Sequence, residues 1–298
     1  MSSTKLKDAT KRVISSMGLM GVIHWIRRWR RLEPYRGIDS ITVTVEGIPI
    51  RFLTKDFASK EFFCARCHDG RLIEEHVSLA LAKDVKSASV FFDIGAHLGW
   101  FTCLVGKLAP NCKVIAFEMN GASCRTLKKN IRANSLTKVD IVQAAVSSTH
   151  GKLTYLAKSR QADASILTQH TKCDRSKNQR VRQTTSVVLD ELVENRAIYP
   201  DIVKIDTEGS EMWVLKGMEA LVKRSRPILY LEVHPHHISN FGSTVEDVLE
   251  WLSRHDYQVF RFRDHRNADQ NFELVPVHSA TEITSNTMLR CQPRESQS

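Results

Sequence analysis

The chain has 298 residues, of which 42% are hydrophobic, and a net charge of +10 at neutral pH. This length and hydrophobic content suit one large folded domain with an appendage, and they exclude a wholly disordered chain. The charge is uneven, because residues 1–40 hold nine lysines and arginines against three acids, a net +6. Only +4 is left for the other 258 residues, which weakens a nucleic-acid-binding role for the main domain.

The seven cysteines favour a cytoplasmic setting. Their number is odd, and Cys103 and Cys124 lie in segments expected to be buried, which suits reduced thiols. The apolar run around residues 19–26 is too short to span a bilayer, which takes about 20 residues. It also lacks the small-residue cleavage site of a secretory signal.

Residues 1–37 are predicted to form a basic N-terminal arm with an amphipathic helix over 17–31. Its apolar face includes Trp25 and Trp29, and its arginines lie largely on the other face. Tryptophans beside arginines are typical of a membrane interface. Most amphipathic helices pack on protein, however, so we favour packing on the domain or on another subunit. Peripheral contact with a membrane surface is the alternative.

Residues 38–84 are predicted to form a β-hairpin and a helical lead-in. Two alternating apolar segments, 41–45 and 48–53, flank a Glu46-Gly47 turn. A helix over 70–86 then leads into the first central strand.

Residues 85–298 are predicted to form one domain in which strands and helices alternate. The strands are expected at 90–93, 113–118, 139–146, 201–206 and 227–233, and the helices at 100–108, 121–134, 209–223 and 244–254. Such alternation predicts an α/β fold, a doubly wound and mostly parallel sheet with helices on both faces. Extended pieces at 152–156, 257–263 and 285–290 would add antiparallel edges. The polar stretch 157–182 is predicted to be a lid or a substrate loop.

The first central strand ends in a motif that indicates a ligand site. Asp93-x-Gly95-x-x-x-Gly99 follows an apolar strand and precedes an amphipathic segment, an order typical of small-ligand sites at the carboxyl edge of a parallel sheet. The spacing is not the Gly-x-Gly-x-x-Gly of a dinucleotide fold, and it favours S-adenosylmethionine. The two glycines let the backbone approach the ligand. Asp93 is expected to accept hydrogen bonds in the turn or from the ligand's ammonium group.

The next two strands supply the other predicted contacts of the donor. Glu118 ends the second strand, 25 positions after Asp93, where a carboxylate can accept both hydroxyls of a ribose. Ala145 lies near the end of the third strand among small apolar residues, which suits a flat adenine ring.

Several motifs together resemble the FkbM-type S-adenosylmethionine-dependent methyltransferases. They are Asp93-Ile-Gly-Ala-His-Leu-Gly-Trp-Phe-Thr, Val-Ile-Ala-Phe-Glu118, Asp201-Ile-Val-Lys-Ile-Asp-Thr-Glu-Gly-Ser-Glu211, Leu215-Lys-Gly-Met and Pro227-Ile-Leu-Tyr-Leu-Glu-Val-His234. The resemblance covers about residues 85–262. It implies the seven-stranded type of methyltransferase sheet and O-methylation of hydroxyl groups on natural products or sugars. The chain departs from the family at Met119-Asn120-Gly121, where Pro-Asn-Pro is common.

Candidate catalytic groups follow the fourth and fifth strands. An alcohol must lose its proton on methylation, so a base or a metal ion is useful there. Asp206 and Glu208 form a paired carboxylate if the chain is extended between them. His234, with an ordinary pKa of about 6.5, is predicted to be the general base.

A divalent metal is a less favoured alternative at the same place. Asp206, Glu232 and His234 would offer oxygen ligands and one imidazole, a set that suits Mg²⁺ or Mn²⁺. The set is incomplete on sequence alone, so no firm metal ligand is predicted. Lys204, inside an apolar strand, is expected to pair with a neighbouring acid. Glu211 is predicted either to cap a helix or to take part in catalysis.

These features predict an S-adenosylmethionine-dependent O-methyltransferase that acts on a hydroxyl of a small molecule, a sugar or a lipid-linked glycan. One alternative, an RNA methyltransferase, is prompted by the +10 charge and the basic 157–182 stretch, but no Asn-Pro-Pro-Tyr-like motif or RNA-binding module supports it. A second is a membrane- or protein-docking module with a non-catalytic methyltransferase fold, which the retained acids argue against. The sequence leaves the acceptor and the oligomeric state open.

Overall fold

The computed structural model describes residues 30–67, 70–158, 164–168, 179–263 and 273–294. Most of the predicted amphipathic helix 17–31 and much of the polar stretch 157–182 lie outside these residues. Within the described part of the chain, no helix is both long enough and apolar enough to cross a membrane.

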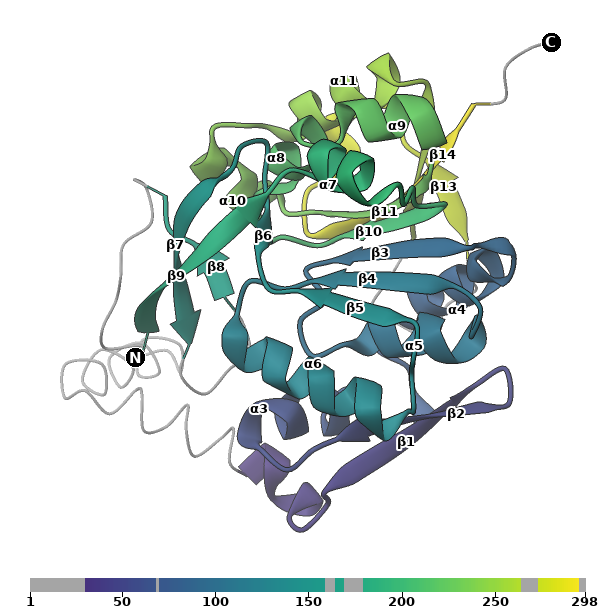
Figure 1. The fold of residues 1–298 in the computed structure, drawn as a ribbon, viewed down its shortest axis with the longest axis vertical. Coiled ribbons are helices and arrows are strands. Elements are labelled where there is room, and N and C mark those ends of the chain that lie inside the picture. The colour runs from purple at the N-terminus through teal and green to yellow at the C-terminus, as the bar shows by residue number, and fades with distance from the viewer. Residues whose placement is uncertain (1–29, 68–69, 159–163, 169–178, 264–272, 295–298) are drawn as a thin grey trace, which may run out of the picture.

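An eight-stranded sheet forms the centre of the fold (Figure 1). Its parallel part contains β11 (Ile228–Val233), β10 (Ile202–Ile205), β3 (Val90–Ile94), β4 (Lys113–Phe117) and β5 (Val139–Val142), in that spatial order. Antiparallel strands continue the sheet beyond β11, namely β14 (Thr287–Pro293), β12 (Tyr257–Phe262) and β13 (Leu274–Pro276). The predicted α/β class with a mostly parallel sheet is confirmed.

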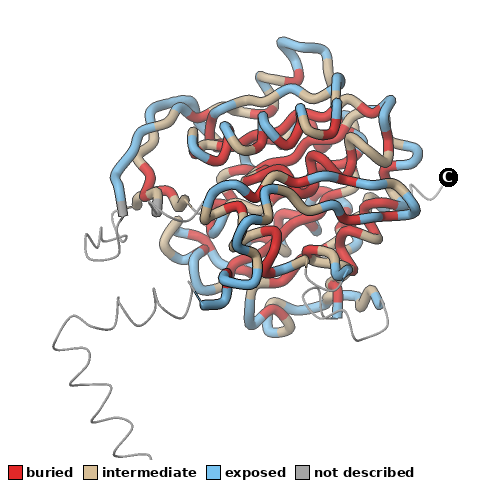
Figure 2. Tube along the Cα trace, turned by 90° about the horizontal axis from the view of Figure 1, so that it is seen from below, coloured by how far each residue is buried: buried red, intermediate tan, exposed pale blue. Residues whose placement is uncertain are grey.

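Helices cover both faces of this sheet (Figure 1). One face carries α4 (Glu75–Asp84), α5 (Trp100–Leu108) and α6 (Gly121–Ala133), and the other carries α7 (Leu189–Arg196), α8 (Glu211–Lys216), α9 (Glu219–Ser225) and α11 (Val245–Arg254). Successive strand residues point to opposite faces, so Phe91 joins the core on the α5 side and Phe92 the core on the α8 side. Figure 2 shows the resulting concentration of buried residues in the middle of the molecule.

The predicted hairpin forms from β1 (Ser40–Val45) and β2 (Ile48–Leu53). Ile50 and Phe52 are buried in the core that contains the α5 side of the sheet. The side chains of Asn130 on α6 and of Asn134 at its C-terminal cap also accept hydrogen bonds from the backbone of β2. A short helix, α3 (Phe57–Ser59), and a π-helix over Lys60–Cys64 connect the hairpin to the main sheet.

Two predicted elements are divided in the structure. The predicted strand 139–146 becomes β5 and β6 (Ala145–Val146), which belong to different sheets because the chain turns at Ala144, whose N–H donates to the carbonyl of Val142. The predicted helix 209–223 is interrupted between α8 and α9. A Cβ on Gly217 would overlap the carbonyl of Ser147, so this break brings the two chain segments into close contact.

A second sheet occupies part of the segment predicted to be a loop. Its strands are β6, β9 (Gln179–Val187), β7 (Gly151–Lys158) and β8 (Ala164–Ile166), in spatial order. The predicted strand 152–156 is therefore longer, and β9 was not predicted, because polar and charged residues dominate its sequence. Helix α7 was also not predicted, since its short apolar stripe is interrupted by acids. Two short helices, α10 (Pro235–Ile238) and a 3₁₀ turn over Ser239–Phe241, follow β11.

Candidate active site

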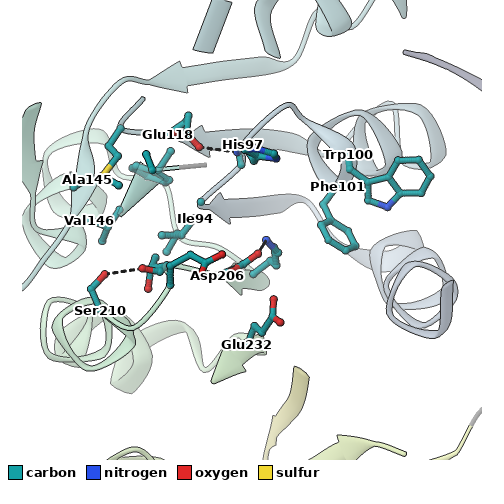
Figure 3. Close-up of a pocket in the computed structure, with 18 of the residues that line it drawn as sticks. Ile94, His97, Trp100, Phe101, Glu118, Ala145, Val146, Asp206, Ser210 and Glu232 are labelled. Atoms are coloured by element: carbon teal, nitrogen blue, oxygen red, sulfur yellow. Dashed lines mark hydrogen bonds and ion pairs between the residues drawn. The ribbon is translucent and has the colours of Figure 1, made fainter. Parts of the chain in front are cut away.

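A cavity of about 200 Å³ lies outside the carboxyl ends of β3, β4, β10 and β11 (Figure 3). β3 is followed in the chain by β4 on one side, while β10 lies on its other side, so this is the point where the strand order reverses. Ligands of doubly wound sheets bind at such points. Glu118 lies on one side of the cavity, and Asp206 and Glu232 lie on the other, with Ile94 between them in this view (Figure 3).

The turn after β3 is held by neighbouring strand ends. The N–H groups of Gly95 and Ala96 donate to the carbonyl of Phe117, at 3.0 and 2.9 Å. Gly95 has φ of +80°, and a Cβ there would overlap the carbonyl oxygen of Asp206. Glycine is therefore required, because the end of β10 passes against this backbone. Gly95 lines the cavity, as the motif predicts.

Asp93 and Gly99 lie behind the cavity wall and do not line it. Asp93 is fully buried and accepts a hydrogen bond from the Thr102 hydroxyl at 2.5 Å, which joins the strand end to α5. Gly99 has φ of +92°, and a Cβ there would press on the side chain of Leu127. Both residues thus shape the turn, one of the two roles expected for Asp93, and their predicted contacts with the donor stay predictions.

Glu118 meets the cavity with its carboxylate fixed in place. Its Oε2 accepts a hydrogen bond from the His97 N–H at 2.8 Å, and its Oε1 accepts one from the Asn120 N–H at 2.6 Å. Burial raises the pKa of Glu118 to about 7, although these two backbone hydrogen bonds act in the opposite direction. Each carboxylate oxygen has a second lone pair. Two hydroxyl donors at once, as in a ribose diol, therefore fit this group.

Small apolar residues form the wall beside Glu118. Ala145 and Val146 of β6 line the cavity together with Ile94, which suits the faces of an adenine ring (Figure 3). Ala164 and Ile166 of β8 line it as well. Sequence analysis missed these two residues, because a short strand inside a polar segment carries no clear periodic signal. The residues on this side of the cavity thus fit the nucleoside part of S-adenosylmethionine.

Acidic side chains and one histidine gather on the opposite side. The Nε2 atom of His234 lies 3.8 Å from Oδ1 of Asp206 and 3.9 Å from Oε1 of Glu232. All three residues line the cavity, and one ligand atom of each lies within 4.8 Å of those of the other two. The structure therefore brings together the three residues that the sequence offered as metal candidates.

Glu211 controls the orientation of His234. Its Oε1 lies 2.8 Å from Nδ1 of His234 and also accepts the N–H of Gly209 at 2.8 Å. Burial lowers the pKa of His234, but the hydrogen bond to Glu211 and the charges of Asp206, Glu211 and Glu232 together raise it to about 9. These contacts favour the protonated imidazole as long as no cation shares the cavity, and the general-base role of His234 stays a prediction.

Lys204 pairs with a neighbouring acid, as predicted. Its Nζ lies 3.2 Å from Oδ2 of Asp206 and 5.1 Å from the centre of the Phe101 ring. Burial raises the pKa of Asp206, but Lys204 and His234 outweigh that effect and hold it below its ordinary value. Burial and the neighbouring acids raise the pKa of Glu232. The carboxylates of this wall therefore differ in basicity because of their neighbours.

Glu208 lies at the solvent side of the same wall. Its side chain is half exposed, with Oε2 3.8 Å from Nε2 of His234 and 3.4 Å from Nδ1 of His237. Its backbone has φ of +55°, a left-handed conformation that costs a non-glycine residue about 1–2 kcal/mol. Such strain concentrates at functional positions.

The methyltransferase FkbM domain family matches residues 93–259, more than half of the chain. The chain belongs to this family. It is therefore an S-adenosylmethionine-dependent methyltransferase, and its motifs coincide with the cavity described above.

The two curated relatives described first are also methyltransferases by name. The chain is 27% identical to the hexuronic acid methyltransferase AglP of Haloferax volcanii, over 76% of this chain and 86% of that protein. It is 23% identical to methyltransferase 1 of Beauveria bassiana, over 59% of this chain and 72% of that protein. The crystal structure of the methyltransferase FkbM from Methylobacillus flagellatus aligns with 15% identity and a TM-score of 0.44, over 68% and 43% of the two chains.

Proposed function

We propose that this methyltransferase forms a methyl ether on a hydroxyl group of a sugar, either free or as part of a lipid-linked glycan. The observation that carries the proposal is the carboxylate wall of Asp206, Glu208 and Glu232, which shares one cavity with Glu118. A wall of this kind accepts hydrogen bonds from hydroxyl groups and can remove a proton. The relative named for a hexuronic acid supports a sugar as the acceptor class.

The two sides of the cavity determine how the substrates would lie. With the ribose on Glu118 and the adenine beside Ala145, the rest of the donor would extend toward the ends of β10 and β11, which border the same cavity. S-adenosylmethionine supplies a methyl group on a positively charged sulfur. The acceptor hydroxyl must then approach from the side of Asp206 and Glu232, where alignment and exclusion of water favour transfer.

Glu208 is the residue we assign to the acceptor proton. Asp206 is held by Lys204, whereas Glu208 is half exposed and can pass a proton to water. Glu208 would take the hydroxyl proton while the oxygen bonds to the methyl carbon, and the electron pair of the broken carbon–sulfur bond would stay with the sulfur of the donor. A positioned proton acceptor contributes about 10²–10⁴-fold to the rate of such steps.

Arg66 at the edge of the cavity supports an acidic sugar within this class. Its guanidinium carbon lies 4.6 Å from the centre of the Phe62 ring, and both residues line the cavity. An arginine on an aromatic ring can bind a carboxylate through two parallel hydrogen bonds. Neutral sugars with the same ring are therefore expected to be poorer acceptors than uronic acids.

The proposal is tested by methyl transfer from labelled donor to uronic acids, neutral sugars, lipids and RNA. We expect labelled product from sugars, with the methyl group on a hydroxyl oxygen by mass spectrometry and NMR. Glu208→Gln should lower the turnover rate about 100-fold while leaving donor affinity unchanged. Glu191→Gln makes the same substitution at an exposed position of α7 that does not line the cavity, and as the control it should leave the turnover rate unchanged.

Other products would overturn parts of this proposal. Transfer only to RNA, or only to a carboxylate oxygen, would contradict the sugar-hydroxyl assignment. Full activity of Glu208→Gln would remove the proton-acceptor role.

A further inference from the structure

We propose that Asp206, Glu232 and His234 form a binding site for a divalent cation, Mg²⁺ or Mn²⁺, on the acceptor side of the cavity. The three residues come from the ends of two adjacent parallel strands, β10 and β11. This inference rests on the proposed function only for what the ion does in catalysis, and the binding itself requires neither donor nor acceptor.

The spacing of the three side chains is that of ligands around a shared ion. Nε2 of His234 lies 3.8 Å from Asp206 and 3.9 Å from Glu232, too far for hydrogen bonds. An octahedral ion with ligands at about 2.1 Å places neighbouring ligand atoms about 3.0 Å apart and opposite ones about 4.2 Å apart. The observed distances lie between these two values, so small side-chain shifts would complete the coordination.

The orientation of His234 is the second, independent observation. Its side chain is 2% exposed, and its Nδ1 is held by Glu211, which is itself fully buried. Nε2 is thereby aimed at Asp206 and Glu232, and it forms no hydrogen bond of its own within the described residues. A histidine that donates one ring N–H to a carboxylate and presents the other nitrogen is the common arrangement of metal-binding histidines.

The charges around the cavity also favour a cation. Asp206, Glu232 and Glu211 meet at His234, and Glu208 lies close by, while Lys204 is the lysine paired with this group. A bound cation would offset part of the negative charge that these carboxylates place along one wall of the cavity. Two carboxylates and one imidazole, with no thiolate, suit Mg²⁺ or Mn²⁺ better than a soft metal.

A cation here would also determine how an acceptor binds. Mg²⁺ and Mn²⁺ prefer six ligands, so three protein ligands leave positions for water or for substrate oxygens. Two neighbouring oxygens of a sugar could occupy two of these positions, which would select vicinal hydroxyls. The ion would then lower the pKa of the reacting hydroxyl, and Glu208 would take the proton.

Binding of Mn²⁺ to the full chain, without donor or acceptor, tests the site. Electron paramagnetic resonance detects free Mn²⁺, and we expect one bound ion per chain. Asp206→Asn and Glu232→Gln should each weaken binding at least about 10-fold. Glu118→Gln, a buried acid on the opposite side of the same cavity, is the matched control and should keep the wild-type affinity.

A second measurement starts from the unmodified protein, so that its first result does not depend on whether the variants of Asp206 and Glu232 fold. Pulsed resonance of Mn²⁺ on the unmodified protein should show coupling to one imidazole nitrogen, and His234→Gln should abolish it. No saturable binding, equal weakening by Glu118→Gln, or no nitrogen coupling would each overturn the inference.

The outcomes for the ion and for the reaction can be separated. Mn²⁺ bound at His234 without methyl transfer to any sugar would contradict the proposed function alone. Sugar methylation that persists after chelation, in a chain that binds no Mn²⁺, would contradict the metal site alone.

Discussion

Nδ1 of His234 lies 2.8 Å from Oε1 of Glu211, and neither side chain is more than 2% exposed. Because an ionised carboxylate only accepts hydrogen bonds, Nδ1 must carry the proton of this contact. The contact joins the first residue of α8 to the residue after β11, and it directs Nε2 into the cavity. Glu211 thus positions the ring of His234, and its two predicted roles, helix cap or catalytic group, stay predictions.

Glu211→Gln should lower the pKa of His234. The hydrogen bond and the charge of Glu211 both raise this pKa toward about 9, whereas burial lowers it. Removing the charge of Glu211 therefore lets the effect of burial lower the pKa of His234. In chelator-treated protein, the imidazole resonance followed by NMR should titrate at a lower pH than in the wild type. Glu191→Gln, a substitution at the surface, should leave the midpoint of the His234 titration unchanged. An unchanged titration in Glu211→Gln would contradict the positioning role.

Donor affinity should rise with pH through the titration of Glu118. The pKa of this buried carboxyl is raised to about 7, and only its ionised form accepts two ribose hydroxyls. If the ionised form alone binds, affinity should increase about 10-fold between pH 6 and pH 8. Calorimetry with S-adenosylhomocysteine, which has the same ribose but no sulfonium charge, should show the same trend. Glu118→Gln should bind weakly at every pH; a persisting pH dependence would assign the titration to another group.

Lys204→Met should destabilise the fold by about 3–5 kcal/mol, because it leaves the charge of Asp206 without its partner in a largely buried site. Adding Asp206→Asn to Lys204→Met should recover part of this loss. Urea denaturation of the wild type, the two single variants and the double variant forms a double-mutant cycle, which measures the interaction energy of the two side chains. Lys86→Met, which removes an exposed ion pair with Glu46, should cost less than about 1 kcal/mol. Equal losses in the two lysine variants would contradict a structural role for the buried pair.

Gly95→Ala should cost more stability than Gly47→Ala. Both glycines have φ near +80°, so both variants bear the left-handed strain of about 1–2 kcal/mol. Gly47 has open space around it, whereas a Cβ on Gly95 meets the Asp206 carbonyl. Denaturation should therefore give a lower free energy of unfolding for Gly95→Ala than for Gly47→Ala. Calorimetry should show a loss of donor affinity for Gly95→Ala and none for Gly47→Ala. Equal stability of the two variants would mean that the end of β10 can move away.

The position of Glu118 at the cavity could be predicted from sequence. Glu118 follows an apolar strand at the expected distance from the first glycine turn, and it meets the cavity as expected. Strand ends and glycine turns are local features, so a short window of sequence suffices. Asp93 and Gly99 do not line the cavity, and their contacts with Thr102 and Leu127 show that a motif residue can also serve the packing of the turn.

The acceptor side shows where sequence reasoning stops. The apolar strand around Lys204 predicted an ion pair with a nearby acid, since a buried ammonium requires a partner. No local pattern indicated that Glu211 would hold His234 or that β8 would line the cavity. These contacts join segments that are far apart in the chain.

Hydrophobic periodicity and glycine spacing were thus enough for the α/β class and the donor motif, and the family followed from the resemblance of several longer motifs. Such patterns reflect which face of each strand or helix is buried, and that is decided residue by residue along the chain. The convergence of Asp206, Glu232 and His234, and the aim of the His234 ring, depended on β10 and β11 being neighbours and on α8 packing beside them. Strand order and side-chain direction result from packing of the whole domain, which is why only the tertiary structure could decide them.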